Sequence, residues 1–362
     1  WPRVINPDGS MREEGIAFYA GLLDRLNDNG IRPFVTLYHW DLPQYIEDQG
    51  GWLNRETAYR FQEYAESVSN AFGSRVYSYA TLNEPFCSAY YGYETGMHAP
   101  GRTSKAEATR AGHHLLLAHG LAMPVLQRNS PNSLNGIVLN FTPCYPATDS
   151  TEDEDAAQRA DDTFNQWFIQ PLMKGRYPSI IDSLPETEKP DVHAGDMDLI
   201  AQPLDFLGVN YYTRAVYRAD PDRPFVRLPP GGGPTTEMGW EIFPEAFTDL
   251  LLSLDRKYSL PPVYITENGA AMDDSINQGL INDQRRVRYF QEHLEAVNRA
   301  MEQGVDVRGY FAWSLMDNFE WAEGYEKRFG LVYIDYSTQQ RTIKMSGLSF
   351  RDMLRRRAQG GD

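Results

Sequence analysis

Hydrophobic residues recur along the chain at two spacings, and segments with one spacing alternate with segments of the other. A spacing of three to four residues is typical of a helix that buries one face. In the segment 12–29 this spacing places Ile16, Leu23 and Leu26 on one side, and Gly30 follows as a stop signal. The same spacing predicts further helices at 54–72, 105–128, 155–174, 245–258, 284–303 and 346–358.

Between these helices lie short stretches that are rich in β-branched and aromatic residues and predict strands. The stretches are 33–40, 76–85, 135–143, 204–213, 262–268 and 307–315. Strands that alternate with helices pair in parallel, so the sequence predicts an α/β fold. The connections from a helix to the next strand are short, whereas those that follow each strand are long. Long loops at the carboxyl ends of the strands mark the working face of an α/β barrel or open sheet.

Composition excludes several classes of function. The 362 residues suffice for two ordinary domains or one large α/β barrel. A formal charge of −16 argues against a nucleic-acid partner, and no apolar run reaches the ~20 residues that span a membrane. Two cysteines, Cys87 and Cys144, are too few for a disulfide framework and favour a reducing, cytoplasmic compartment. The sequence holds no metal or nucleotide motif, so we expect neither a metal nor another cofactor.

Two glutamates stand at the ends of predicted strands, Glu267 in "YITENG" and Glu84 in "TLNEP". Each alone could be a solvated loop residue, the partner of an arginine or a helix cap. Together, without a metal motif, they indicate glycosidic cleavage, which uses one carboxylate as nucleophile and one carboxyl group as proton donor. The donor must stay protonated near neutral pH, and the charge of a nearby nucleophile raises its pKa in that direction.

Sugar recognition also requires polar groups for the hydroxyls and aromatic side chains for the C–H face of the ring. The other predicted strand ends, and the loop beyond the last strand, supply both kinds: His39, Trp40, Asn210, Tyr212, Trp313, Glu320 and Trp321. The composition agrees with this interpretation, since 22 Tyr and 7 Trp suit a ligand that is part apolar and part hydrogen-bonding.

Five motifs together resemble glycoside hydrolase family 1, the family of β-glucosidases and β-galactosidases. They are "TLYHWDLPQ", "TLNEP", "LGVNYYT", "YITENG" and "YFAWSLMDNFEWAEGYEKRFGL", in the order of the family, and the resemblance extends from the first residue to about Phe350. The resemblance implies one catalytic domain over 1–362, built as a (β/α)8 TIM barrel. It also implies a retaining double displacement on a β-glycoside or oligosaccharide.

Residue roles follow from the same resemblance, motif by motif. Glu267 matches the nucleophile and Glu84 the acid/base, while Asn83 would hold the sugar 2-hydroxyl. Tyr212 would orient Glu267, and Asn210 would lie close to one of the two carboxylates. The remaining substrate contacts would be His39, Glu320 and Trp321 on the 3-, 4- and 6-hydroxyls, Trp313 under the glycone, Trp240 at the aglycone, and Trp40 and Phe329. Cys87 and His98 could line the outer subsite.

The start of the chain departs from the family pattern. Family members carry two strands before an "SWPR" motif, with a Gln for the 3- and 4-hydroxyls and an Arg near the nucleophile, and this chain begins at "WPR". We therefore expect the barrel to be N-terminally incomplete, with its first two strands missing from this sequence. The missing segment would then be a partner of the chain, as further residues or as a separate piece.

The resemblance thus implies an exo-acting β-glucosidase that removes terminal non-reducing β-D-glucosyl residues, and it leaves galactose and fucose open as other sugars that could be released. Such an activity contributes to the breakdown of cellulose and other carbohydrates. Glu320 followed by Trp321 favours an unphosphorylated sugar, and Glu84 argues against a thioglycosidase. The alternative is a sugar-binding or inactive barrel remnant, because the missing segment would carry substrate contacts. The sequence leaves a homo-oligomer open, and it does not fix the preferred aglycone.

Overall fold

The computed structural model describes residues 1–277 and 279–359, which form two compact units. Unit 1 contains Trp1–Asn140 and Asp162–Gly208, and unit 2 contains Phe141–Asp161 and Val209–Asp362. The expectation of one catalytic domain over 1–362 stays a prediction. Among the described helices, none is both long and hydrophobic enough to cross a membrane.

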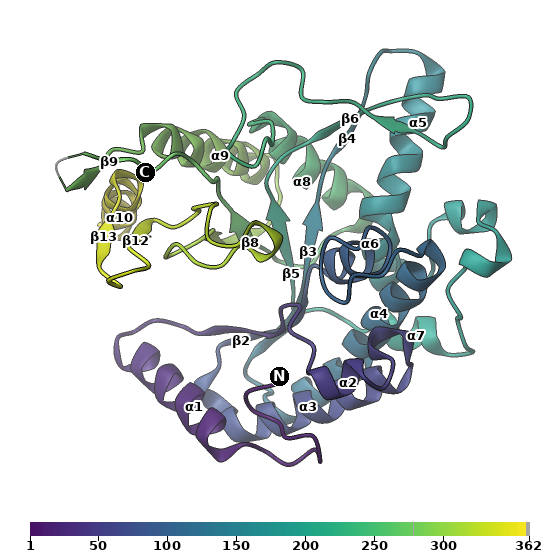
Figure 1. Cartoon of the computed structure of the whole chain (residues 1–362), viewed down its shortest axis with the longest axis horizontal. Coiled ribbons are helices and arrows are strands. Elements are labelled where there is room, and N and C mark those ends of the chain that lie inside the picture. The colour runs from purple at the N-terminus through teal and green to yellow at the C-terminus, as the bar shows by residue number, and fades with distance from the viewer. Residues whose placement is uncertain (278, 360–362) are drawn as a thin grey trace. The chain divides into compact units, whose positions relative to one another are not determined.

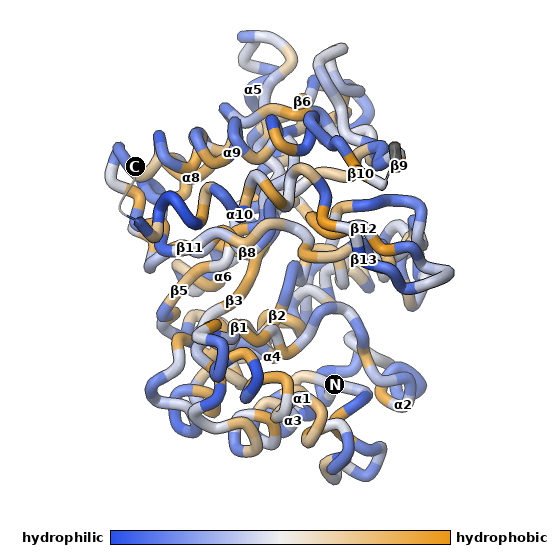
Figure 2. Tube along the Cα trace, turned by 90° about the vertical axis from the view of Figure 1, so that its left-hand side faces the viewer, coloured by the Kyte–Doolittle hydropathy of each residue, from blue (hydrophilic) through white to orange (hydrophobic). Residues whose placement is uncertain are grey.

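Parallel strands form the centre of unit 1, in the order β1 (Phe34–Tyr38), β2 (Ser78–Asn83), β3 (Leu134–Phe141) and the beginning of β5 (Phe206–Tyr211). β1 pairs with β2, and β2 with β3, both in parallel. Every residue of β2 is buried. In Figure 2, β1 and β3 appear as largely hydrophobic stretches. A parallel strand that is covered on both faces, as β3 is over most of its length, needs such a run of apolar residues; in β1, the first strand in the order, Thr36 is exposed.

In unit 1, helices lie along one side of these strands, with α1 and α3 below β2 in the view of Figure 1. The α-helices are α1 (Glu13–Asp28), α2 (Gln44–Glu47), α3 (Glu56–Phe72), α4 (Lys105–Asn129), α6 (Trp167–Lys174) and α7 (Asp196–Ile200). Shorter 3-10 or π-helical turns are η1 (Gly51–Leu53), η2 (Gly73–Arg75), η3 (Cys87–Tyr91), η4 (Asp162–Gln166), η5 (Ser179–Ser183) and η6 (Glu186–Glu188). Helix α3 packs against α4 and buries the apolar face that its sequence predicts, including Phe61 and Val68.

The main strands of unit 2 are the end of β5, β8 (Val263–Asn268) and β11 (Val307–Ala312), in that order, and β8 pairs with β11 in parallel. Its helices are α5 (Thr151–Asp161), α8 (Glu245–Tyr258), α9 (Gln284–Glu302), α10 (Met345–Ala358) and the short η7 (Trp321–Glu323). Helices α8 and α9 lie side by side (Figure 1). The polar last turn of α10 follows from its three consecutive arginines and appears as a hydrophilic stretch in Figure 2.

All six predicted main strands are present, but the long loops contain strands that the sequence did not predict. Unit 2 adds a three-stranded sheet of β4 (Cys144–Pro146), β6 (Ala215–Arg218) and β7 (Val226–Arg227). It also adds the pairs β9 (Ile276–Asn277) with β10 (Leu280–Ile281) and β12 (Val332–Ile334) with β13 (Arg341–Ile343). Strands of two to four residues are too short for an alternating hydrophobic pattern.

The single helix predicted at 155–174 is wrong in detail. The chain forms α5, then the π-helical turn η4, then α6, and the break coincides with the boundary between the two units. Helix α5 begins earlier than predicted, at Thr151, and Ser150 Oγ accepts a hydrogen bond from the backbone N–H of Asp153 at 3.3 Å. Such a side-chain acceptor satisfies an N–H group of the first turn and favours a helix start there.

Candidate active site

The end of β2 in unit 1 positions the residues around Glu84. Asn83 is the last residue of β2, and His39 and Trp40 directly follow β1. Because β1 and β2 are parallel neighbours, with Tyr38 opposite Leu82, these residues leave the sheet at the same edge. The indole N–H of Trp40 donates to the carbonyl of Asn83 at 2.9 Å, and Asn83 Nδ2 lies 3.1 Å from His39 Nε2. The structure thus brings together four predicted site residues.

Burial controls the charge of His39. Desolvation lowers the pKa of His39 to about 4, so the ring is neutral at pH 7 and its Nε2 can accept a hydrogen bond from the amide of Asn83. Burial also lowers the pKa of His98, whose ring centroid lies 5.3 Å from that of Trp40. A neutral imidazole beside an amide is suited to hydrogen bonding with sugar hydroxyls.

Two residues at these strand ends have left-handed backbone conformations that are uncommon for residues other than glycine. Trp40 has a φ of 77° and Glu84 a φ of 45°. Such conformations cost roughly 1–3 kcal/mol each and are concentrated at functional sites. For Glu84, backbone hydrogen bonds to both sides hold the conformation: its N–H donates to the carbonyl of Val138 at 2.9 Å, and its carbonyl accepts from Cys87 N–H at 2.9 Å.

The thiol of Cys87 contacts the carboxylate of Glu84. Cys87 Sγ donates to Glu84 Oε2 at 3.1 Å, and both side chains are buried, with Glu84 6% exposed. The sequence suggested only that Cys87 could line an outer subsite. The contact arises because the π-helical turn η3 begins at Cys87, three residues after Glu84. A spacing of three residues in a predicted loop gave no signal for it.

The end of β8 in unit 2 positions Glu267, which is 8% exposed. The phenol of Tyr212, the residue after β5, donates to Glu267 Oε2 at 2.6 Å. A phenol–carboxylate hydrogen bond of this length is strong and stabilises the ionised carboxylate. The predicted contact between Tyr212 and Glu267 is therefore present in the structure.

Asn268 carries a side chain that is typical of turns, yet it lies inside the strand. It is the last residue of β8 and fully buried, and its Nδ2 donates to the carbonyl of Tyr211 at 2.7 Å. The hydroxyls of Tyr289 and Tyr310 lie 3.0 and 2.5 Å from its Nδ2 and Oδ1. This network fixes the backbone next to Glu267. Gly269 follows because a Cβ there would lie 1.9 Å from the carbonyl oxygen of Trp313.

The other predicted residues of unit 2 lie at two places. Asn210 is fully buried in β5, and its Oδ1 accepts from Thr266 Oγ1 at 2.6 Å, next to Glu267 in the sequence. Trp240 and Phe329 lie with Tyr212 in one aromatic group. The ring centroids of Tyr212 are 5.3 Å from Trp240 and 6.1 Å from Phe329, and those of Trp240 and Phe329 are 6.2 Å apart.

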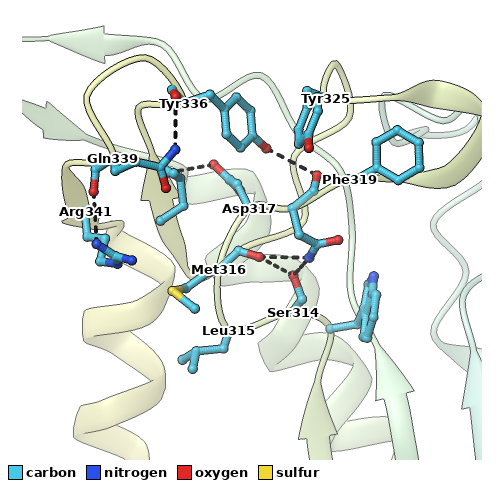
Figure 3. Close-up of a pocket in the computed structure, with 12 residues that line it drawn as sticks. Ser314, Leu315, Met316, Asp317, Phe319, Tyr325, Tyr336, Gln339 and Arg341 are labelled. Atoms are coloured by element: carbon cyan, nitrogen blue, oxygen red, sulfur yellow. Dashed lines mark hydrogen bonds between the residues drawn. The ribbon is translucent and has the colours of Figure 1, made fainter. Parts of the chain in front are cut away.

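Trp313, Glu320 and Trp321 belong to the segment that follows β11 and includes β12, here called the 313–334 loop. Its first residues line a pocket of about 680 Å³, shown in Figure 3 with Phe319 and Tyr325 on one side and Gln339 and Arg341 on the other. The loop is folded back on itself, since Glu320 N–H donates to the carbonyl of Gly324 at 2.7 Å. The sugar contacts of these three residues stay predictions.

The described part of the chain contains no group of three or more His, Cys, Asp and Glu side chains that could hold a metal ion. The structure therefore supplies carboxylates, amides, imidazoles and aromatic rings at the two strand ends. These are the groups that metal-independent chemistry on a sugar uses.

Comparison with known proteins identifies the family. The model of glycosyl hydrolase family 1 matches residues 1–359. A bifunctional β-D-glucosidase/β-D-fucosidase of Bifidobacterium breve is 45% identical, over 95% of this chain and 80% of that protein. The β-glucosidase A of Thermotoga maritima is 42% identical, over 98% of this chain and 80% of that protein. The structure of a family 1 β-glucosidase from Thermotoga maritima with isofagomine lactam superposes with a TM-score of 0.95, at 41% identity over 98% of this chain and 81% of that one.

The chain belongs to glycosyl hydrolase family 1, a family of glycosidase enzymes, which confirms the resemblance found in the sequence. Its parallel strands and intervening helices agree with the TIM-barrel fold of its structural relatives. Neither the structure nor the comparisons support the further expectation that two barrel strands are missing.

Proposed function

We propose that this protein is an exo-acting, retaining β-glycosidase that hydrolyses terminal β-D-glucosyl residues, with Glu267 as nucleophile and Glu84 as acid/base. The proposal is supported by relatives named as β-glucosidases along nearly the whole chain, one of them also as a β-D-fucosidase. A β-D-fucosyl group is therefore a second candidate glycone. The observation that carries the proposal is the 2.6 Å hydrogen bond from Tyr212 to Glu267 within the matching family motif.

In the first step, the carboxylate of Glu267 would attack the anomeric carbon and form a glycosyl ester, while Glu84 gives its proton to the leaving oxygen. In the second step, Glu84, now ionised, would take a proton from water. That water attacks the anomeric carbon and the ester bond to Glu267 breaks, which inverts the anomeric centre a second time. The free sugar is released, and Glu267 returns to its carboxylate form. The net configuration is retained, because each step inverts the anomeric centre.

The other predicted contacts would bind the sugar in this reaction. Asn83, held next to the neutral His39, would contact the 2-hydroxyl, where a hydrogen bond strengthens in the transition state. Glu320 and Trp321 would contact hydroxyls further round the ring, and Trp313 would pack under it. Trp240 and Phe329, which pack against Tyr212 with tilted and edge-on rings, would contact the aglycone and the substrate beside the nucleophile.

A sugar-binding protein without catalysis is the less favoured candidate, since both carboxylates and the phenol that contacts one of them are in place. Turnover of an aryl β-D-glucoside separates the two functions. Wild-type protein should release the aryl alcohol, and Glu267→Gln should reduce kcat by at least about 10⁴-fold, because the amide cannot form the glycosyl ester. Tight glucose binding by wild-type protein without turnover would instead identify a sugar-binding function.

The retaining mechanism has its own test. With an activated 2-deoxy-2-fluoro-β-D-glucoside, wild-type protein should accumulate a covalent sugar adduct on the peptide that contains Glu267. Glu267→Gln should remain unlabelled under the same conditions. Labelling of a different carboxylate, or release of product with inverted configuration, would contradict the assignment of Glu267.

A further inference from the structure

Unit 2 contains a buried network of charged side chains, here called the ionic cluster: Asp274, Asp283, Arg286, Asp317, Arg328 and Lys344. Five of these side chains are 0% exposed, and Arg328 is 19% exposed. The three carboxylates balance the three cations. A buried ion is tolerated only with its partner, so the loss of one member leaves an uncompensated charge in the protein interior.

Lys344 connects two separate loops through this cluster. Its Nζ donates to Asp274 Oδ2 at 2.5 Å, in the connection between β8 and α9, and to Asp317 Oδ1 at 2.7 Å, in the 313–334 loop. Its backbone N–H donates to the carbonyl of Leu331 at 3.0 Å, near the end of the same loop. Lys344 is the residue before α10, so it fixes both loops to the start of a helix.

Arg286, in α9, makes a second connection. Its Nε donates to the carbonyl of Ala270 at 3.0 Å, three residues after the proposed nucleophile Glu267. Its Nη2 donates to the carbonyl of Arg328 at 2.8 Å, directly before Phe329. The same guanidinium holds Asp274 through both nitrogens, at 2.8 and 3.0 Å. The end of β8 and the base of the 313–334 loop therefore share one buried cation.

Asp317 joins the beginning of the 313–334 loop to its end. Its carboxylate accepts from the backbone N–H of Gly330 at 2.9 Å and from that of Ile334 at 3.3 Å, and from Arg328 Nη1 at 2.7 Å. A Cβ at Gly330 would lie 2.2 Å from the nitrogen of Asp317, so this close approach requires glycine. In Figure 3, Asp317 lies near the middle of the residues that line the pocket, with Gln339 on one side and Phe319 on the other. Glu320 and Trp321 lie in the part of the loop between Asp317 and Gly330.

We propose that Lys344 and Asp317 are positioning residues, which hold the 313–334 loop against the end of β8 and thereby set the sugar selectivity of the enzyme. The loop carries Glu320 and Trp321, whose predicted partners are sugar hydroxyls. The selectivity part of the inference rests on the proposed function. The positioning part rests on the ionic cluster alone.

Lys344→Met tests the selectivity part, because it removes the ammonium group and keeps the length of the side chain. The substrates are p-nitrophenyl β-D-glucoside and the β-D-galactoside, its C4 epimer. The ratio of their kcat/KM values should change by about 10-fold or more, through KM more than kcat, since displaced binding groups lose their orientation. The conservative variant Lys344→Arg, which keeps the charge, should recover most of the wild-type ratio.

A matched control perturbs a buried ion pair elsewhere. In unit 1, Asp196 binds Arg55 and lies 2.9 Å from His113 Nε2, between α3, α4 and α7. Asp196→Asn should lower the Tm, as Lys344→Met should, yet keep the glucoside-to-galactoside ratio within about twofold of wild type. If the glucoside-to-galactoside ratio changed equally in Lys344→Met and Asp196→Asn, general destabilisation would explain the effect of Lys344. That result would overturn the proposal.

Hydrogen–deuterium exchange tests the positioning part without any turnover. Lys344→Met should speed exchange of the 313–334 loop and leave α8, which contains none of the six residues of the ionic cluster, at the wild-type rate. If Lys344→Met does not fold, Asp317→Asn provides the same comparison. A folded variant with wild-type selectivity and wild-type loop exchange overturns the proposal. If wild-type protein turns over neither glycoside, the proposed function fails, and loop exchange still decides whether the ionic cluster positions the loop.

Discussion

Glu84 and Glu267 occupy equivalent places at the ends of buried parallel strands, but their surroundings differ. Glu267 lies within its strand, β8, and accepts a 2.6 Å hydrogen bond from the phenol of Tyr212. Glu84 lies just after its strand, with a left-handed backbone, and accepts a 3.1 Å hydrogen bond from the thiol of Cys87. A phenol is a strong donor to a carboxylate, whereas a thiol is a weak one.

This difference fits the proposed division of roles. A nucleophile must be ionised when substrate binds, and a strong donor stabilises that state. An acid/base must lose and regain a proton in every cycle, so a strong fixed donor would oppose half of its reaction. Two identical side chains, at equivalent places in the fold, thus have hydrogen-bond donors of different strength beside them, a phenol at Glu267 and a thiol at Glu84. Four predictions test this comparison, in order of decreasing effect.

The largest of these effects is expected for Glu84→Ala. Loss of the proton donor should reduce kcat/KM for cellobiose or an alkyl β-D-glucoside by about 10²–10⁴-fold, because the leaving alkoxide needs the proton. Activated aryl glucosides, such as the 2,4-dinitrophenyl compound, should be affected much less in the bond-cleaving step. Steady-state kinetics over a series of leaving groups measures how kcat/KM depends on the pKa of the leaving group. Equal losses for all leaving groups would contradict the acid role.

The second prediction concerns acid stability, which should differ between the two units. Burial lowers the pKa of His39 and His114 to about 4 and of His119 to about 3, all in unit 1, and that of His293 to about 4 in unit 2. A histidine whose pKa is depressed by folding binds its proton more readily in the unfolded chain. Its stabilising contribution is therefore present above pH 6.5, decreases as the pH falls below 6.5, and is fully lost below the folded-state pKa.

Each such buried histidine should cost roughly 2 kcal/mol between pH 6.5 and pH 5. Unit 1 should therefore lose protection against amide hydrogen exchange at pH 5 before unit 2 does, and His119→Gln should narrow the difference. Native-state hydrogen exchange at pH 7 and pH 5 measures both. Equal loss in the two units would show that these three histidines do not control the acid stability of the Glu84 region.

The sequence predicted the parts of this comparison that depend on topology. Parallel strands place their carboxyl ends at one edge of the sheet, so Glu84, Asn83 and His39 could be assigned to a common region from the strand pattern alone. The helix predicted at 245–258 has the same bounds as α8. Periodicity is strongest in such amphipathic helices, and tertiary contacts changed these boundaries little.

Features that depend on buried polar contacts were not predictable. Asn268 carries the side chain typical of a turn, yet three neighbours satisfy its amide inside the core. Lys344 and Asp274 are 70 positions apart and appear in the sequence as ordinary surface residues. Charged residues are rarely buried, so a pattern of hydrophobic positions assigns them to the surface. Only the folded chain shows which charges compensate one another.

Tyr212→Phe gives the third prediction, because it removes the phenol donor and keeps the ring against Trp240. Hydrogen bonds to charged groups contribute about 1.5–3 kcal/mol, so kcat should fall by roughly 10–100-fold. The acidic limb of the pH–rate profile should also move to higher pH, since the ionised form of Glu267 is less stabilised. A profile of kcat/KM against pH measures the shift. An unchanged acidic limb would show that the phenol of Tyr212 does not stabilise the ionised form of Glu267.

Cys87→Ala should produce the smallest effect, and it determines how far the comparison extends. A thiol donates weakly, so its loss should change kcat by only about two- to fivefold, well below the effect of Tyr212→Phe. Cys87→Ser places a stronger hydroxyl donor at the same position. This stronger hydrogen bond should stabilise the ionised form of Glu84. The hydrolysis of substrates with poor leaving groups should therefore slow more than that of activated substrates. If Cys87→Ser instead speeds the hydrolysis of substrates with poor leaving groups, the weakness of the thiol donor does not explain the acid role of Glu84. The difference between the surroundings of Glu84 and Glu267 would then have another cause.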